Sequence, residues 1–206
     1  MTKSTTNLWG GRFKAGPSEA LTLLSRSHPT YFRLFPEDIL GSQAHALELE
    51  RAGILTSEET ATIKNELQQI KQDIEAGEVA PGMQDEDVHS FLERVLMQRL
   101  GSLGGKLRAG RSRNDQTSNN TRLYLRRIVR EITVSLIEVQ EALSQQAENH
   151  VDTILPGFTH LQPAQPVSLG HHLMAHAQSI QRDIQRFEDW DKRFSTSPLG
   201  AAALAG

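Results

Sequence analysis

The sequence predicts an all-α protein, in which a small N-terminal helical domain precedes part of a bundle of long helices. Apolar residues recur at steps of three and four through most of the chain, which is the period of a helix. Glycines follow several of these periodic segments, at the places where helices commonly stop. The segment from about Asp115 to about His150 contains neither Gly nor Pro, which predicts one long uninterrupted helix.

The composition excludes several kinds of function. A net charge of −3 gives no general attraction to nucleic acids or acidic membranes, so neither is expected as a partner. The absence of cysteine excludes disulfides, thiolate nucleophiles and cysteine-based zinc sites. The N-terminus lacks the apolar core of a signal peptide, and no apolar run approaches the roughly 20 residues that span a bilayer. We therefore expect a cytoplasmic protein.

The first part of the chain is expected to be an extended arm. Residues 1 to about 35 lack a sustained period and contain several glycines and prolines, with one helical stretch near Ser18 to Ser25. After Pro36 the pattern becomes helical from Glu37 to Ala52, and Gly53 is placed to end this helix.

Two further helices complete an N-terminal domain that we assign to residues 1–110. Thr56 and Glu59 have the spacing of a capping box, and the helix that they open ends at Gly77. The next helix runs from about Asp85 to Leu100, and Gly101 to Gly110 is predicted to be a flexible connector. The inward faces of the two helices are formed by Ile63, Leu67, Ile70 and Ile74, and by Val88, Phe91, Leu92, Val95 and Leu96.

Residues 111–206 are assigned to the first long antiparallel helices of an incomplete bundle. Three prolines interrupt the helical pattern, so residues 155–167 are predicted to form a stiff turn. A second long helix begins at Ser168 and lasts to about Phe194. Two helices of this length expose apolar stripes that the N-terminal domain cannot cover, which predicts packing against partner helices.

The first long helix separates two polar runs, Gly110–Gln116 and Gly157–Pro166. At ~1.5 Å rise per residue, roughly 35 residues span about 50 Å, so Asn114 and His160 cannot meet within one chain. If both runs serve one site, several chains build that site.

Three patterns invite functional interpretations that the rest of the sequence does not support. His172 and His176 have a zinc-like spacing, but no third ligand is evident, so packed polar positions are favoured over a metal site. The segment Gly101–Lys106 lacks the spacing, the following Ser or Thr and the strand of a phosphate loop. Arginines at steps of four from Arg122 to Arg130 favour a solvated or inter-subunit face over nucleic-acid binding.

Two other patterns carry more chemistry. From Arg111 to Asp115, two guanidinium groups, a hydroxyl and an amide stand at a helix N-terminus, and such a corner binds carboxylates. Simple capping by Asn114 or Asp115 explains the same residues equally well. His160 and Thr159 lie in a proline-stiffened segment, where a base or hydrogen-bond donor is plausible, although a structural role would also account for a single histidine.

Taken together, these runs resemble the signatures of argininosuccinate lyases, a branch of the fumarase and aspartase superfamily. The Gly110–Gln116 run is similar to one that is specific to this branch, whereas Thr159–Pro166 is similar to a loop shared across the superfamily. Leu8–Phe13, Asp85–His89 and Ser197–Gly206 resemble further blocks, so the resemblance covers nearly the whole chain.

The resemblance implies cleavage of argininosuccinate to arginine and fumarate by β-elimination, without a metal or an organic cofactor. It also implies a homotetramer with a central helical bundle, in which three chains assemble each active site. His160 matches the histidine assigned to proton transfer. The other matching positions are those that bind substrate, Ser27, Arg113, Asn114 and Thr159, and those in supporting roles, Asp87, His89, Arg111 and Gln162.

The chain departs from the family pattern in two respects. Tyr31 stands four residues after Ser27, where the family usually has Asp, which alters the local substrate contacts. The family's flexible loop with its catalytic serine has no counterpart in these 206 residues. We therefore expect the N-terminal portion of a lyase, inactive or nearly inactive by itself.

Two alternatives remain open. A truncated homologue would act as a binding or assembly module that inserts its long hairpin into the bundle of a full-length lyase. A lyase of a neighbouring branch would act on fumarate, aspartate or adenylosuccinate, and the Gly110–Gln116 run argues against it.

Overall fold

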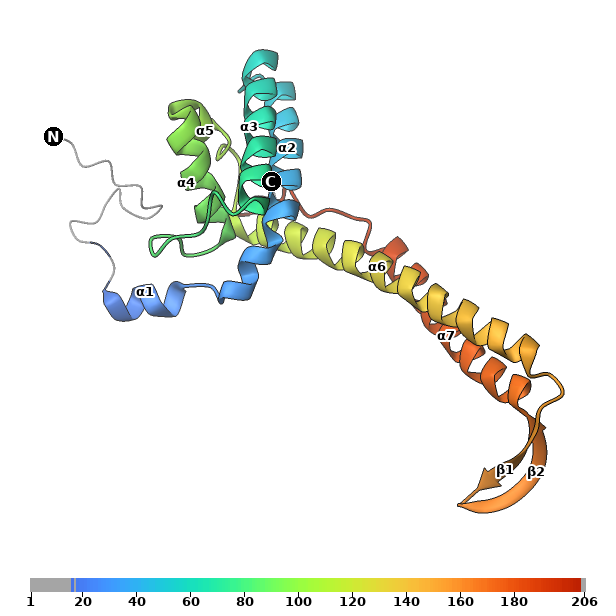
Figure 1. The fold of residues 1–206 in the computed structure, drawn as a ribbon. Helices are drawn as coiled ribbons and strands as arrows, with labels where there is room; N and C mark the ends of the chain where they lie inside the picture. The colour runs from blue at the N-terminus through green and yellow to red at the C-terminus, as the bar shows by residue number, and fades with distance from the viewer. Residues whose placement is uncertain (1–15, 17, 205–206) are drawn as a thin grey trace. The chain divides into compact units, whose positions relative to one another are not determined.

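The computed structural model describes residue 16 and residues 18–204 of the chain (Figure 1). These residues form, in order, α1 (Glu19–Ser25), η1 (Pro29–Leu34), α2 (Phe35–Arg51), α3 (Ser57–Glu75), α4 (Val88–Leu100), α5 (Ser102–Lys106), α6 (Arg113–Asn149), β1 (Ile154–Thr159), β2 (Gln162–Ser168) and α7 (Leu169–Arg193). The predicted all-α class is confirmed, because a two-stranded sheet is the only β-structure among the described residues. The Leu8–Phe13 block lies outside the described residues.

The chain divides into two compact units. The N-terminal unit comprises the chain up to Leu123 together with the segment from Pro198, and the hairpin unit comprises Tyr124–Ser197. This division falls inside α6, later than the boundary between residues 110 and 111 that the sequence suggested. The predicted boundary stays a prediction, and the two units are described separately below.

The helices of the N-terminal unit begin and end where local chemistry dictates. The predicted capping box is present, since the Thr56 side chain accepts from the Glu59 backbone while the Glu59 carboxylate accepts from the Thr56 N–H. The next helix begins at Val88 rather than near Asp85, because Asp87 caps it by accepting from Ser90 N at 2.7 Å. The predicted glycine stops at 53, 77 and 101 all have positive φ.

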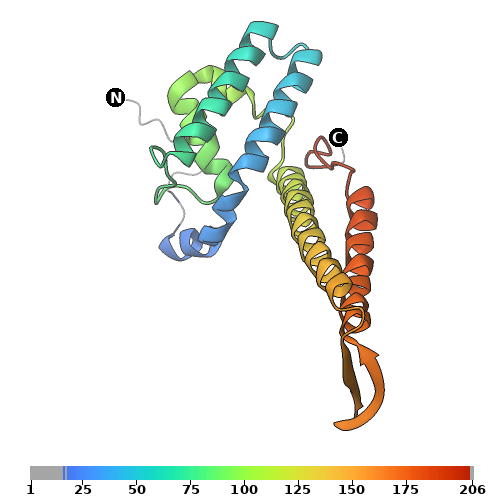
Figure 2. The ribbon, with the colours of Figure 1, turned by 45° about the vertical axis from the view of Figure 1, so that its right-hand side comes forward.

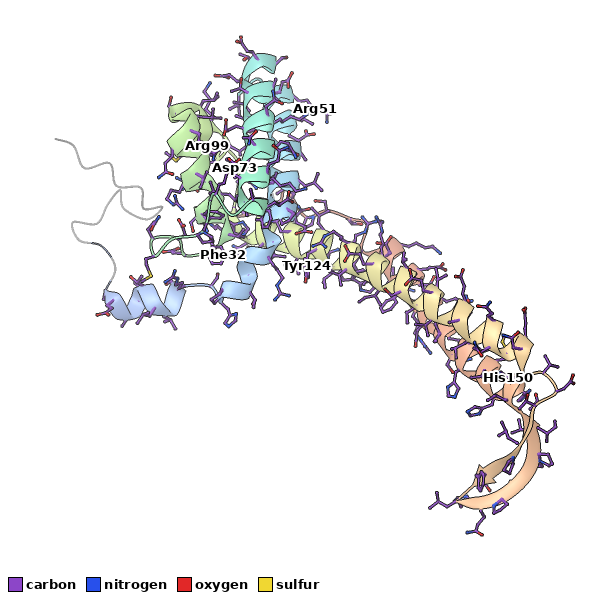
Figure 3. All side chains as sticks on the ribbon, viewed as in Figure 1. Phe32, Arg51, Asp73, Arg99, Tyr124 and His150 are labelled. Atoms are coloured by element: carbon purple, nitrogen blue, oxygen red, sulfur yellow. The ribbon has the colours of Figure 1, made fainter. Side chains whose placement is uncertain are left out.

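The core of the N-terminal unit lies between α2, α3 and α4, and α2 and α3 run side by side as an antiparallel pair (Figure 1). The predicted inward faces are confirmed for Ile63, Leu67 and Ile70 of α3 and for all five named apolar residues of α4, which are at most 3% exposed. Ile74, which was assigned to the same face of α3, is only half-buried. Each such side chain contributes about 1.5–3 kcal/mol by leaving water. At the rim, Arg99 of α4 pairs with Asp73 of α3 at 2.6 Å (Figure 3).

The prediction of a flexible connector from Gly101 to Gly110 is wrong over half of this segment, because residues 102–106 form α5. Gly104 lies so close to α4 that an added Cβ would come within 2.9 Å of the Leu96 carbonyl oxygen. The glycines that suggested flexibility thus allow a short helix to pack directly on α4.

In the hairpin unit, α6 and α7 lie side by side as an antiparallel pair joined by β1 and β2 (Figure 2). Gly170, Ala177 and Ile184 are the buried residues of α7. Polar contacts also tie the helices together: Gln140 donates to the Ala177 carbonyl at 3.2 Å, and Arg126 binds Asp191 at 2.7 Å. None of the helices among the described residues combines the length and the apolar character that a membrane-spanning segment needs.

The prediction of a stiff turn for residues 155–167 is wrong, because this segment forms an antiparallel β-hairpin. Its loop is His160-Leu161, both residues having positive φ, 49° and 62°. The three prolines exclude a continuous helix, as expected, but both strands of a two-stranded ribbon are edges, where proline is tolerated. Gly157 lies at a register shift, and an added Cβ would come within 2.6 Å of the Gln165 carbonyl oxygen.

Candidate functional site

A buried carboxylate joins three helices of the N-terminal unit. Asp38 of α2 is 2% exposed, and its Oδ2 accepts hydrogen bonds from Gln116 at 2.8 Å and Asn120 at 2.7 Å, both on α6. The same oxygen is bonded to Nδ1 of His89 on α4. We call these four residues the Asp38 network. Because a buried charge is stable only when its hydrogen bonds are satisfied, the network fixes α2, α4 and α6 to one another.

Burial would raise the pKa of the Asp38 carboxyl, but the hydrogen bond and charge of His89 outweigh it and lower that pKa, with help from Arg111 and Asn120. Asp38 is therefore ionised at neutral pH. Nδ1 of His89 is bonded to this carboxylate, and Nε2 of the same ring lies near the side chains of Tyr31 and Thr117.

A chain of hydrogen bonds leads from His89 to Tyr31. The Tyr31 hydroxyl donates to Thr117 Oγ1 at 3.1 Å, and Thr117 Oγ1 lies 3.1 Å from His89 Nε2. The Tyr31 hydroxyl itself lies 3.2 Å from the same nitrogen. Burial raises the pKa of the half-buried Tyr31, so its phenol stays protonated. Tyr31 thus supplies a neutral, oriented hydroxyl next to His89.

The predicted corner at the start of α6 is formed around an ion pair. Nη1 of Arg113 donates to Oδ2 of Asp87, the residue that caps α4. Burial would raise the pKa of Asp87, but the Ser90 N–H and the charge of Arg113 lower it. The Ser27 N–H donates to the carbonyl oxygen of residue 86 at 2.8 Å, and the side chain of Asn114 is exposed beside Arg113.

Asp115 helps to cap the start of α6, where the Ser112 hydroxyl accepts from the backbone N–H of Asn114 at 3.3 Å. Its buried side chain accepts from the backbone N–H of Ser112 at 3.3 Å. It also accepts from Gly200 N at 3.0 Å and Ala202 N at 2.9 Å, which holds the segment after Pro198 against the start of α6. The side chain of Asn114 remains exposed next to this cap.

The remaining predicted site residues lie on the hairpin. Thr159 ends β1, Gln162 begins β2, and His160 occupies the two-residue loop between them. All three side chains are exposed. Positive φ at a non-glycine residue is strained, and such strain is common at functional positions.

The structure therefore gathers the predicted residues into two groups. Ser27, Asp87, His89, Arg111, Arg113 and Asn114 belong to the N-terminal unit, and Thr159, His160 and Gln162 belong to the hairpin unit. Sequence reasoning missed Asp38 and Thr117. Gln116 and Asn120 lie one helical turn apart at the polar start of a helix, but this spacing does not identify the residue that they contact.

Among residue 16 and residues 18–204, no group of three or more His, Asp or Glu side chains is arranged to hold a metal ion. His172 and His176 instead make an edge-to-face ring contact, with centroids 5.0 Å apart.

Comparisons with known proteins show that the chain is similar to lyases. The profile of the family described as Lyase matches residues 11–206. Argininosuccinate lyase 2 of Rhizobium meliloti (strain 1021) is 66% identical over 201 residues, which are 98% of this chain and 41% of the relative. Argininosuccinate lyase 1 of Pseudomonas fluorescens (strain Pf0-1) is 60% identical over 206 residues, 100% of this chain and 43% of the relative.

Solved structures share the fold. A crystal structure of EDDS lyase in complex with formate superposes with a TM-score of 0.74 at 33% identity, over 90% of this chain and 36% of that one. A fumarate lyase:delta crystallin from Brucella melitensis has a TM-score of 0.72 at 18% identity over 89% of this chain and 47% of that one, which is a likeness of fold.

The chain spans about two fifths of the length of the curated relatives it matches, with 41% and 43% covered in the two cases above. Since the family profile extends from residue 11 to residue 206, the chain belongs to the lyase family.

Proposed function

We propose that this chain contributes part of the active site of an argininosuccinate lyase, which cleaves argininosuccinate to arginine and fumarate by β-elimination in the cytoplasm. The observation that carries the proposal is the identity of 60–66% with two curated argininosuccinate lyases over 98–100% of the chain. The two groups of polar residues described above contain the kinds of side chain that this reaction needs, namely groups that transfer protons and groups that bind carboxylates.

Elimination requires removal of a proton from carbon and stabilisation of the charge that develops on the neighbouring carboxylate. His160 is proposed to take part in proton transfer, because its imidazole is exposed on a short, conformationally restricted loop. Thr159 is proposed to contact substrate next to it, and Gln162 to support the loop from the facing strand.

The corner at the start of α6 is proposed to bind the other end of the substrate. Asn114 and Ser27 supply uncharged hydrogen-bonding groups, and Arg113 supplies positive charge at the helix start. Asp87 orients the Arg113 guanidinium, while His89 and Arg111 hold the corner from within. No cofactor is needed for these roles.

The length of α6 supports assembly of the site from several chains. Its 37 residues correspond to about 55 Å, with Asn114 in its first turn and His160 beyond its last. Apolar side chains also remain exposed along it, including Ile132 at 42%, Val134 at 57% and Val139 at 49%. We propose that these side chains pack in the central bundle of a homotetramer.

The 206 residues alone are proposed to show no turnover, because the resemblance assigns the catalytic serine to a later segment of the relatives. The test is fumarate release from argininosuccinate, followed by ultraviolet absorbance. The chain is assayed alone and after mixing with the remaining segment of the Rhizobium meliloti relative. Activity in the mixture alone supports the proposal, and turnover by the isolated chain contradicts it.

A second candidate function is favoured by the same exposed apolar residues of α6. The chain would then act as an assembly module that enters the bundle of a full-length lyase. A cavity of about 410 Å³ between α6 and α7, lined by Val139, Leu143, Leu169 and Leu173 among others, offers a place for a partner's side chains. Co-purification of tagged chain with the full-length Rhizobium meliloti relative, without any gain of activity, would favour this candidate over the first.

A further inference from the structure

Tyr31 connects two segments that carry proposed substrate-binding residues. It lies in η1, which begins shortly after Ser27, and its hydroxyl donates to Thr117 Oγ1 at 3.1 Å. Thr117 lies on α6 one turn after Asn114, so the two side chains lie on the same side of that helix. A single side chain therefore bridges the segment of Ser27 and the helix start that carries Asn114.

Ser27 also has a backbone anchor, which leads toward α4. The Ser27 N–H donates to the carbonyl oxygen of residue 86 at 2.8 Å, and the neighbouring Arg26 donates to the Gly82 carbonyl at 3.3 Å. Both acceptors lie in the loop that precedes α4, so these bonds place Ser27 next to α4. The hydrogen bond between Tyr31 and Thr117 adds the contact with α6.

The hydroxyl of Tyr31 rests against His89. Nε2 of His89 lies 3.2 Å from the Tyr31 hydroxyl and 3.1 Å from Thr117 Oγ1. The two rings meet edge to face, with centroids 5.9 Å apart. Because His89 is itself bonded to the buried Asp38, the hydroxyl contacts a part of the core that the surrounding helices hold in place.

The phenol stays protonated, so the bridge does not depend on a change of charge near neutral pH. Burial, and after it the charges of Asp87 and Asp38, raise the pKa of Tyr31, whereas the Thr117 hydrogen bond and the charge of Arg113 lower it, and the net effect is a raised pKa. The charges of Asp87 and Arg113 act on the hydroxyl because it lies near the corner that their ion pair forms.

We propose that Tyr31 is a positioning residue for the substrate site at the start of α6. Through Thr117 it holds Ser27 and Asn114 at the spacing at which both side chains contact one substrate. Neither of these two transfers a proton in the proposed mechanism, which is the task of His160, so a change of their spacing weakens substrate binding more than the chemical step. This role rests on the proposed lyase function, whereas the contact between Tyr31 and Thr117 does not.

The test uses the 206-residue chain completed with the remaining segment of the Rhizobium meliloti relative, and it measures kcat and KM for fumarate release from argininosuccinate. Tyr31→Phe removes the hydroxyl and keeps the ring. Thr117→Val removes the acceptor with little change of shape, whereas Thr117→Ser keeps a hydroxyl. Tyr124→Phe is the matched control, because the Arg127 guanidinium lies over the Tyr124 ring at 5.3 Å from its centroid, a contact that Phe retains.

Tyr31→Phe and Thr117→Val are each expected to raise KM about tenfold, the size of change that one hydrogen bond produces, while kcat changes by less than about twofold. Because both variants remove the same hydrogen bond, the double variant should have no higher KM than either single variant. Thr117→Ser and Tyr124→Phe should keep the KM of the unmodified protein. Urea unfolding shows which variants are folded, and if Tyr31→Phe is not, the comparison of Thr117→Val with Thr117→Ser decides.

The possible failures can be told apart. An unchanged KM in Tyr31→Phe, or increases of KM that multiply in the double variant, would overturn the positioning role while the lyase function stands. A fall of kcat at constant KM would also overturn it, because Tyr31 would then act on the chemical step. A completed protein that releases no fumarate would contradict both the proposed function and the role of Tyr31 in it.

Discussion

Replacing Asp38 by Asn removes the negative charge at the centre of the Asp38 network while keeping the shape of the side chain. Three donors point at one carboxylate oxygen: His89 Nδ1, Gln116 Nε2 at 2.8 Å and Asn120 Nδ2 at 2.7 Å. A hydrogen bond to a charged acceptor contributes about 1.5–3 kcal/mol, against about 0.5–1.5 kcal/mol for a neutral one. The three bonds therefore weaken by about 1 kcal/mol each, and we expect Asp38→Asn to lower the free energy of unfolding by about 3 kcal/mol.

Urea unfolding measures this loss. With an m-value of about 1.5–3 kcal/mol/M, the midpoint of the N-terminal unit should fall by roughly 1–2 M. Because the two units can unfold separately, hydrogen exchange of α3 peptides identifies the transition that belongs to this unit. Asp189→Asn is the matched control, since Asp189 is 71% exposed and its contact with Lys192 is long, at 3.8 Å.

The pH dependence checks the same reasoning. The pKa of Asp38 in the folded protein lies below its unfolded value of 3.8, so its ionised form contributes stability above that value. The difference between the unmodified chain and Asp38→Asn should be complete at neutral pH and shrink as the pH falls below 3.8. A loss of less than about 1 kcal/mol at pH 7, or a difference that does not change with pH, would refute the account of the network.

Three further predictions concern other parts of the fold. Gly104→Ala should lower the free energy of unfolding by about 1–3 kcal/mol, because the new Cβ would lie 2.9 Å from a carbonyl oxygen of α4. Gly105→Ala should be neutral or stabilising, because no atom lies within 4 Å of its new Cβ, and the urea midpoints of the two variants test this difference. Gly170→Ala places a Cβ 2.6 Å from a carbonyl oxygen near the end of α6, and faster hydrogen exchange at the start of α7 should follow. Hydrogen bonds from Arg126 and Arg130 lower the pKa of Asp191 to about 2, so an NMR titration should show that this pKa rises toward 3.8 in Arg126→Gln. An unchanged pKa in the variant would contradict the pairing of Arg126 with Asp191.

The helices were predictable from the sequence because their signals are local. The apolar faces of α3 and α4, the capping box at Thr56 and the glycine stops depend only on residues within a few positions of one another. The β-hairpin was not predictable in the same way. Its loop is His160-Leu161 rather than the Asn-Gly pair typical of such turns, and its prolines favoured an irregular segment.

The candidate site shows the same contrast. The corner from Arg111 to Asp115 could be recognised because its residues are consecutive at a helix start. Asp38 could not, since its partners on α4 and α6 lie 51 to 82 positions away in the chain. The pairing of Arg113 with Asp87 likewise arises from packing and has no sequence signature.

The central claim is that chains of this kind contribute different residues to one shared lyase site. Its most direct test measures fumarate release by the chain completed with the remaining segment of the Rhizobium meliloti relative. Asn114→Ala and His160→Ala are each assembled alone and then dissociated and reassembled together. We expect each variant alone to be inactive, and the mixture to regain activity through sites that draw an intact Asn114 and an intact His160 from different chains. A mixture that assembles yet stays as inactive as its components would contradict the claim.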